Sequence, residues 1–134
     1  AAYEAATQES VRAVGCVAHD TLFAGCSPDG YVGDFAGLVE VKCPTPAIHW
    51  AYVSAGIVPQ DYLHQIYHQL WMVPQAGFCD WVSFCPDFPK ALRLKRVRVD
   101  RDEAKASSYE FMARIFLAEV DKEHQHMREL GGTL

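Results

Sequence analysis

The chain has 134 residues, of which 50% are hydrophobic and 22% are charged. This length and composition fit one globular domain and exclude a disordered chain. No apolar run is long enough for a transmembrane helix, and no signal-peptide pattern opens the sequence. We therefore expect a single domain over residues 1–134 that has no membrane partner.

The chain carries 12 Lys and Arg against 17 Asp and Glu, which gives a formal charge of −5. This balance excludes a protein that is basic over its whole surface. However, seven of the twelve basic residues lie between residues 90 and 105. A local basic stripe is what phosphate binding requires, whereas basic side chains also protect solvated strand edges, so both interpretations stay open.

The five cysteines form no Cys-x-x-Cys pair. Their odd number and their spacing argue against a secreted disulfide framework and against a four-cysteine metal or iron–sulfur site. Buried free thiols in a reducing cytoplasm are the simplest interpretation.

Local patterns predict an alternation of strands and helices. In chain order we expect the end of a helix at 1–10, strands at 11–18 and 22–26, a hairpin of 31–33 and 38–43, and helices at 47–55 and 60–73. Two more strands at 78–84 and 92–99 precede a long helix from about 101 to 128. The predicted class is α/β, with a mixed central sheet flanked by helices.

Two of these helices carry recognisable apolar faces. In the helix at 60–73 the face consists of Leu63, Ile66, Tyr67, Leu70 and Trp71. In the last helix, a buried stripe is expected from Tyr109, Met112, Ala113, Phe116 and Val120. Asp100 is expected to cap the last helix, with Glu103 completing a capping box. We also expect Trp50, Trp71 and Trp81 in the core rather than at a base-stacking surface.

The hairpin places acidic and basic side chains together. If its turn centres near Asp34, Asp29 lies opposite Glu40. Because side chains alternate along a strand, Glu40 and Lys42 share one face, while Val39 and Val41 share the other.

Two carboxylates beside a lysine suggest metal-dependent phosphodiester hydrolysis. Carboxylates suit Mg²⁺ or Mn²⁺, and a lysine can activate water or neutralise charge that develops on phosphorus. The alternative is structural, because Asp in a Pro-Asp-Gly turn is common and Glu-Val-Lys is often a solvated strand face.

Ser27-Pro28-Asp29-Gly30, followed by Glu40-Val41-Lys42-Cys43-Pro44, resembles the PD-(D/E)xK nuclease superfamily. More narrowly, it resembles the viral-recombinase branch of YqaJ-type and phage-lambda-type exonucleases. Similarity continues through residues 61–69, 80–84 and 101–103, in the same order as in that family. The resemblance implies a restriction-endonuclease-like core.

The resemblance also implies roles for individual residues. Asp29 and Glu40 would bind Mg²⁺, or Mn²⁺, together with the main-chain carbonyl of Val41. Lys42 would position or activate the attacking water. Gln65 would face the site, and helical geometry sets it about 190° from the apolar face. Weaker candidates for substrate binding are Ser27, Gln69, Arg93 and Lys95.

One motif of this family is missing from the sequence. Tyr3-Glu4 resembles the pair that follows the first catalytic glutamate, so that glutamate would lie upstream of Ala1 and Glu4 would not be its counterpart. We therefore expect a catalytic core without its N-terminal part, in which one of two metal ions would bind weakly.

The implied activity is 5′-to-3′ resection of linear double-stranded DNA in the cytoplasm of a bacterial host, with a phage or prophage origin. A single-strand annealing protein would use the product, and relatives form a homotrimer around DNA. Two alternatives stay open: an endonuclease or repair nuclease of the same superfamily, and a nonhydrolytic DNA-binding remnant of the fold.

Overall fold

A computed structural model describes residues 1–131 of the chain. In chain order its elements are α1 (Ala2–Thr7), β1 (Val17–Ala18), β2 (Gly25–Cys26), β3 (Gly30–Val32), β4 (Gly37–Lys42), α2 (Pro46–Ala55), α3 (Gln60–Met72), β5 (Phe78–Phe84), the short 3₁₀ helix η1 (Lys90–Leu92), β6 (Leu94–Asp100) and α4 (Glu103–Glu129). The predicted mixed α/β class is confirmed.

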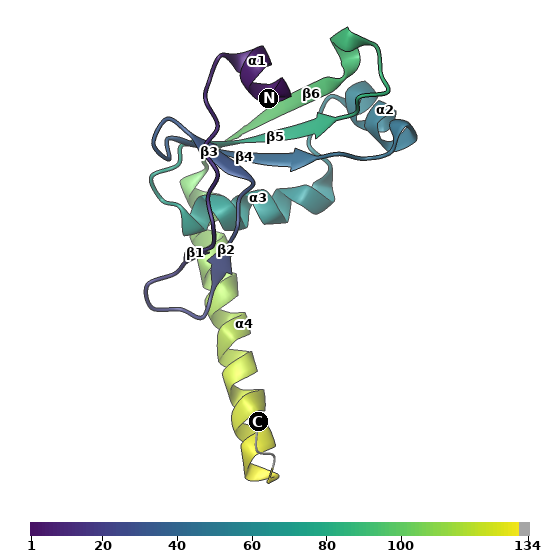
Figure 1. The fold of residues 1–134 in the computed structure, drawn as a ribbon. Coiled ribbons are helices and arrows are strands. Elements are labelled where there is room, and N and C mark those ends of the chain that lie inside the picture. Colours follow the sequence, from purple (N-terminus) through teal and green to yellow (C-terminus); the bar gives the residue numbers. More distant parts are fainter. Residues whose placement is uncertain (132–134) are drawn as a thin grey trace.

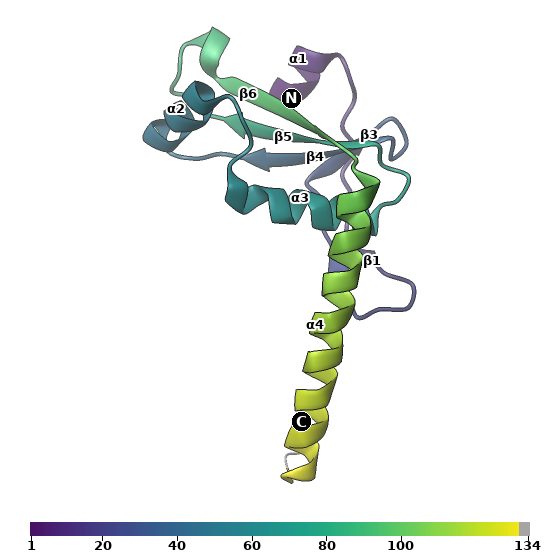
Figure 2. The same ribbon diagram turned by 180° about the vertical axis from the view of Figure 1, so that it is seen from behind.

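The central sheet has the strand order β3-β4-β5-β6. Strands β4 and β5 are parallel, and the other two pairs are antiparallel. A parallel pair needs a long crossover, which α2 and α3 supply. Helix α3 crosses one face of the sheet, and α1 lies on the opposite side (Figures 1 and 2).

The β3–β4 hairpin has the predicted register. Its turn contains Gly33, Asp34 and Phe35, all with positive φ. Gly30 pairs with Val39, so the next position outward sets Asp29 opposite Glu40.

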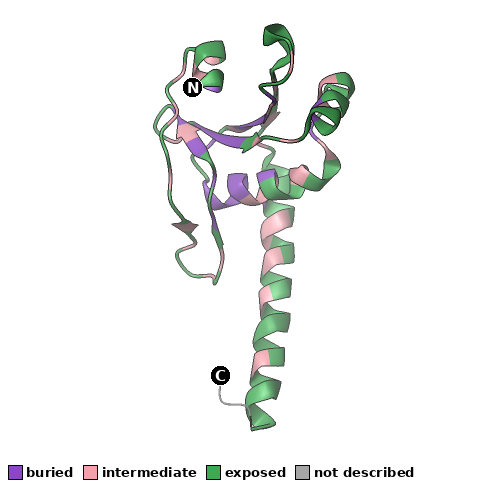
Figure 3. Cartoon of the chain, turned by 45° about the vertical axis from the view of Figure 1, so that its right-hand side comes forward, coloured by how far each residue is buried: buried purple, intermediate pink, exposed green. Residues whose placement is uncertain are grey.

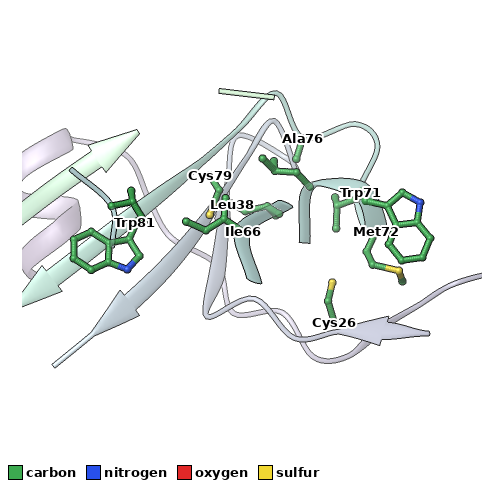
Figure 4. Close-up of a cluster of buried hydrophobic side chains, with 11 residues drawn as sticks. Cys26, Leu38, Ile66, Trp71, Met72, Ala76, Cys79 and Trp81 are labelled. Carbon is green, nitrogen blue, oxygen red and sulfur yellow. The ribbon is translucent and has the colours of Figure 1, made fainter. Parts of the chain in front are cut away.

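The larger core lies between the sheet and α3 (Figure 4). Leu38, Cys79 and Trp81 project from β4 and β5 and are fully buried, as is Ile66 of α3. Val39 and Val82 point to the other face, where Tyr3 of α1 covers them. The predicted apolar face of the helix at 60–73 is therefore confirmed as a core face.

The predicted strand at 11–18 is wrong over most of its length. Only Val17–Ala18 form a strand, paired with Gly25–Cys26, and Arg12 makes a single bridge to Tyr31. Because β3 has only three residues, it gives the preceding segment little edge to pair with.

The predicted cap of the last helix is also wrong. Asp100 is the last residue of β6, where it pairs with Phe78. The side chain of Asp102 caps α4 instead, accepting a hydrogen bond from the Lys105 N–H at 3.1 Å. The strand thus runs farther than its sequence pattern indicated.

Helix α4 leaves the body of the domain and projects away from it (Figures 1 and 3). Tyr109 and Ala113 pack against the core, but Met112, Phe116 and Val120 are exposed. The prediction of a buried stripe is therefore wrong beyond the first turns of α4. No other element of residues 1–131 covers the part of the helix that contains Phe116 and Val120.

The expectation for the tryptophans is confirmed in part. Trp71 and Trp81 are buried, whereas Trp50 on α2 is 55% exposed. None of the five cysteines forms a disulfide, and Cys16 and Cys43 are exposed. Within the described residues, no helix has the length and apolar character needed to span a bilayer.

Candidate active site

The predicted site residues meet where β4 leaves the sheet. Glu40 and Lys42 lie on the face that α3 covers, and they contact Gln65 and Gln69 of that helix. Pro44 follows directly and ends the strand, because proline supplies no N–H to a sheet ladder.

Asp29 is held at the edge of β4. Tyr31 exchanges both main-chain hydrogen bonds with Arg12, at 3.0 Å each, which turns Gly30 toward β4. The chain before Gly30 leaves the sheet, and Oδ2 of Asp29 accepts the Val41 N–H at 2.7 Å. The carboxylate thus replaces a missing strand neighbour and stays exposed beside Glu40.

Glu40 is a buried carboxylate with a complete set of donors. It is 2% exposed. Its Oε1 accepts from Nζ of Lys42 at 2.5 Å and from Nε2 of Gln65 at 2.8 Å. Its Oε2 accepts from Nε2 of Gln69 at 2.7 Å. Burial of a carboxylate is costly without such partners, so these three side chains satisfy and orient Glu40.

The two glutamine amides are themselves oriented. The Gln65 carbonyl oxygen accepts from Nζ of Lys42 at 3.3 Å. The Gln69 carbonyl oxygen accepts from Sγ of Cys79 at 3.8 Å. Burial raises the pKa of the Cys79 thiol and the charge of Glu40 raises it further, so the thiol keeps the proton it donates. Each amide N–H therefore faces the carboxylate.

Lys42 is the cation of the site. Besides Glu40 and Gln65, its Nζ lies 4.9 Å from the centroid of the Tyr62 ring, in cation–π range. The Lys42 side chain is partly exposed to solvent. Tyr62 was missed from sequence, although its position one helical turn before Gln65 could have shown it.

The donor set fits a hard divalent cation. Within residues 1–131, no three His, Cys, Asp or Glu side chains form a metal cluster. Mg²⁺, however, is commonly bound by one or two carboxylates, with waters and substrate phosphate completing its shell. Asp29 and Glu40 supply two carboxylates, and the main chain of Val41 lies between them.

The weaker candidates are scattered. The Ser27 hydroxyl donates to the Gly15 carbonyl at 3.4 Å. Gln69 is buried beneath Glu40, so it supports the carboxylate from within the domain. Lys95 pairs with Ser83, which itself pairs with Lys42, so Lys95 shares the face of the site. Arg93 lies in the β5–β6 connection, where its Nε donates to the Phe88 carbonyl at 2.7 Å.

Part of the basic stripe serves the opposite face of the sheet. Asp80 is fully buried there and accepts from Arg98 at 2.8 and 2.9 Å and from the Tyr3 hydroxyl at 2.7 Å. Arg96 is a further partner at 3.4 Å. Burial alone would raise the pKa of Asp80, but the hydrogen bonds from Arg98 and Tyr3 and the two positive charges outweigh it and lower that pKa.

Other members of the stripe are also engaged within the domain. Arg101 donates to the Leu70 carbonyl and to Glu103, and Lys105 donates to the Tyr67 hydroxyl. Phosphate binding by the stripe therefore stays a prediction, and within residues 1–131 it concerns the residues of the β5–β6 connection and Lys95, which lie near the end of the sheet that carries Lys42.

The mixed sheet, with Glu40 and Lys42 on β4 and Asp29 directly before β3, defines the restriction-endonuclease-like fold class. The YqaJ-like viral recombinase domain matches residues 1–77, more than half of the chain, and the chain belongs to that family. No curated protein sequence matches it.

Solved structures show the same fold. The alkaline exonuclease LHK-Exo of Laribacter hongkongensis is 33% identical, with a TM-score of 0.87, over 95% of this chain and 65% of that enzyme. The same enzyme in complex with dAMP gives the same values. A phage related exonuclease from Haemophilus somnus 129PT is 12% identical, with a TM-score of 0.69, over 93% of this chain and 66% of its own, which supports the fold alone. The chain thus spans 65% of the length of the Laribacter enzyme.

Proposed function

We propose that this chain is the catalytic core of a metal-dependent deoxyribonuclease that degrades linear DNA from its ends. The observation that carries the proposal is the contact of Lys42 with Glu40 at 2.5 Å, next to the exposed carboxylate of Asp29. Membership of a viral recombinase family and similarity to an alkaline exonuclease support the same class of reaction. The dAMP bound to the Laribacter enzyme supports a deoxynucleotide substrate.

In the proposed mechanism Asp29, Glu40 and the Val41 carbonyl would hold Mg²⁺, with Mn²⁺ as a substitute. The cation would supply Lewis acidity toward a phosphate oxygen and would favour ionisation of the attacking water. Lys42 Nζ orients that water and stabilises the negative charge that develops on the phosphate. Gln65 keeps Nζ in place, because its amide bonds both Lys42 and Glu40.

The finer parts of the proposal concern polarity and partners. We propose 5′-to-3′ resection of double-stranded DNA in a bacterial cytoplasm by a protein of phage or prophage origin. A 3′ single strand would remain, which is the substrate of a single-strand annealing protein. The exposed apolar side chains of α4 support assembly with further protein surface, and a homotrimer is the assembly we propose.

The test uses 5′-phosphorylated linear duplex DNA with Mg²⁺ and covalently closed circles as the substrate control. Lys42→Ala is compared with Lys122→Ala, which removes an exposed lysine of α4 far from the site. We expect loss of linear DNA only, abolished by Lys42→Ala and unchanged by Lys122→Ala. Cleavage that survives Lys42→Ala would contradict the mechanism, and cleavage of circles would favour the endonuclease alternative.

A second candidate function is nonhydrolytic DNA binding. Only two carboxylates meet at the site within residues 1–131, which is the observation that favours it. Duplex binding without cleavage, in Mg²⁺ and in Mn²⁺, would support this alternative over the nuclease.

A further inference from the structure

One exposed tryptophan lies at the end of the sheet that carries Lys42. Trp50 is 55% exposed, and its ring stacks on Phe88 with centroids 6.4 Å apart and planes 24° from parallel. Phe88 belongs to the connection that follows β5, whereas Trp50 belongs to α2. Two segments far apart in sequence thus meet in one aromatic pair. Helix α2, which carries Trp50, lies beyond the ends of β4 and β5 (Figure 1).

The position of this aromatic pair is fixed by a buried histidine. His49 is fully buried, with Nδ1 2.7 Å from the Ser83 hydroxyl and Nε2 2.8 Å from the Leu92 carbonyl. Because a carbonyl only accepts, Nε2 donates to Leu92, and in the neutral imidazole Nδ1 then accepts from the Ser83 hydroxyl. The His49 ring also packs edge-on against Phe88 at 4.8 Å. These contacts of His49 fix α2 against the β5–β6 connection, and they therefore also fix the position of the next residue, Trp50.

The same chain of contacts leads to the catalytic lysine. Ser83 is the partner of Lys42 in the parallel β4–β5 pair, one strand spacing of about 4.8 Å away. The aromatic pair therefore adjoins the site through Ser83 and His49, with no other strand between them.

Positive charge lies in the connection that carries Phe88. Lys90 and Arg93 are exposed in the same connection, and Lys95 follows on β6. Arg93 uses Nε on the Phe88 carbonyl, and its terminal nitrogens have no partner within residues 1–131. Asp87 is the one acidic residue of this connection, so the net charge of the surface is positive.

We propose that Trp50, Phe88, Lys90 and Arg93 form a binding surface for single-stranded DNA beside the active site. Aromatic rings stack on bases, whose faces are accessible in a single strand and hidden in a duplex, while basic side chains contact the phosphates. The surface engages a strand after it has separated from its complement, next to the site of hydrolysis. This inference rests on the proposed nuclease function and adds that the surface beside the active site binds single-stranded rather than double-stranded DNA.

The test measures binding of a fluorescent oligothymidylate and of a blunt duplex by anisotropy, in EDTA so that no DNA is cleaved. Trp50→Ala is expected to weaken oligothymidylate binding by about 5- to 150-fold, the range of one lost stacking contact, and to leave duplex binding unchanged. Trp50→Phe is expected to restore most of the affinity. Ile48→Ala removes another exposed apolar side chain from the same helix and is expected to change neither measurement.

Arg93→Gln supplies an independent measurement. The logarithm of the binding constant for oligothymidylate falls linearly with the logarithm of the salt concentration. Arg93→Gln is expected to make this slope shallower by about 0.7, the value for one lost phosphate contact. Equal affinities of wild type, Trp50→Ala and Arg93→Gln for the oligothymidylate would overturn the proposal. So would a change in the mass of the assembly on Trp50→Ala with unchanged DNA affinity, since Trp50 would then lie in a protein interface. Circular dichroism of Trp50→Ala checks that the domain remains folded.

The same proteins separate this inference from the nuclease proposal. If cleavage depends on Lys42 but Trp50→Ala does not change single-strand binding, the proposed binding surface is overturned and the nuclease function is not. Trp50-dependent binding without cleavage in any metal would overturn the nuclease function and leave the surface standing.

Discussion

The Gln69 amide nitrogen lies 2.7 Å from Oε2 of Glu40, inside the domain and behind the carboxylate. Gln65 donates to the other oxygen from the solvent side of the same helix. One turn of α3 therefore supplies both neutral donors to Glu40, and each donor has a distinct consequence for substitution.

Gln69→Leu is expected to destabilise the fold. It leaves a buried carboxylate oxygen without its donor and the Cys79 thiol without its acceptor, which costs about 1–3 kcal/mol. Urea denaturation measures the change. Gln125→Leu is the matched control, because Gln125 donates to Glu129 at 3.0 Å on the exposed surface of α4 and should cost little. Equal losses from the two variants would contradict the role of Gln69.

Gln65→Leu is expected to reduce the rate of DNA cleavage more than the stability. It removes the amide that joins Lys42 to Glu40, and a hydrogen bond to a charged group is worth about 1.5–3 kcal/mol, or roughly 10- to 150-fold in rate. Single-turnover cleavage of linear duplex measures the effect. The exposed neighbour His64 has no hydrogen bond in the described part of the chain, so His64→Ala is the control; a loss of rate as large as that of Gln65→Leu would argue against positioning by Gln65.

Tyr3 gives the stability of the domain a dependence on alkaline pH. Burial raises the pKa of Tyr3 to about 12, and its hydrogen bond to Asp80 and the charge of that carboxylate raise it in the same direction. The ordinary tyrosine pKa is about 10, so the folded state favours the protonated hydroxyl. The resulting stabilisation is fully present below pH 10 and is lost as the pH rises through 12.

Tyr3→Phe should therefore lower the melting temperature at neutral pH and flatten its decline between pH 10 and 12. Melting curves followed by circular dichroism over this range check the expectation. Tyr31→Phe is the control, since the Tyr31 ring stacks on Phe35 at 3.9 Å and the stack survives the loss of the hydroxyl. A decline in Tyr3→Phe that is as steep as in the wild type would contradict the assignment.

The end of the hairpin that carries the proposed site could be predicted from sequence because its geometry depends on local patterns. Period-two alternation and one turn are enough to set Asp29 opposite Glu40 and to place Lys42 on the same face. Helical periodicity likewise placed Gln65 off the apolar face. These features need no knowledge of how distant segments pack.

Contacts between distant segments could not be predicted in this way. The Cys79–Gln69 contact depends on the β4–β5 register, which the crossover through α2 and α3 sets. The stacking of Trp50 on Phe88 depends on the same crossover. In α4, the pattern identified an apolar side but not whether another element covers it, and Phe116 is consequently exposed.

Gly30→Ala should impair both stability and cleavage, because Gly30 lies where two main-chain segments approach closely. A Cβ at this position would lie 3.1 Å from the Arg12 carbonyl oxygen and would overlap the Val11 side chain. The main chain must shift to accommodate it, at a cost of about 1–3 kcal/mol. Since Asp29 is the preceding residue and depends on the same strand end to reach the Val41 N–H, the shift also displaces a proposed metal ligand.

Gly15→Ala is the matched control for this substitution, because a Cβ at Gly15 meets nothing within 4 Å. It should leave cleavage unchanged, and its stability should stay equal or rise by about 0.4–1 kcal/mol, since alanine restricts the unfolded chain. Urea denaturation and initial cleavage rates in the presence of Mg²⁺ measure both variants. If Gly30→Ala kept its free energy of unfolding but cleaved DNA slowly, the close approach at Gly30 would affect the position of Asp29 and not the stability of the domain. If it were unstable yet fully active per folded molecule, the expected displacement of Asp29 by a shift at Gly30 would be contradicted.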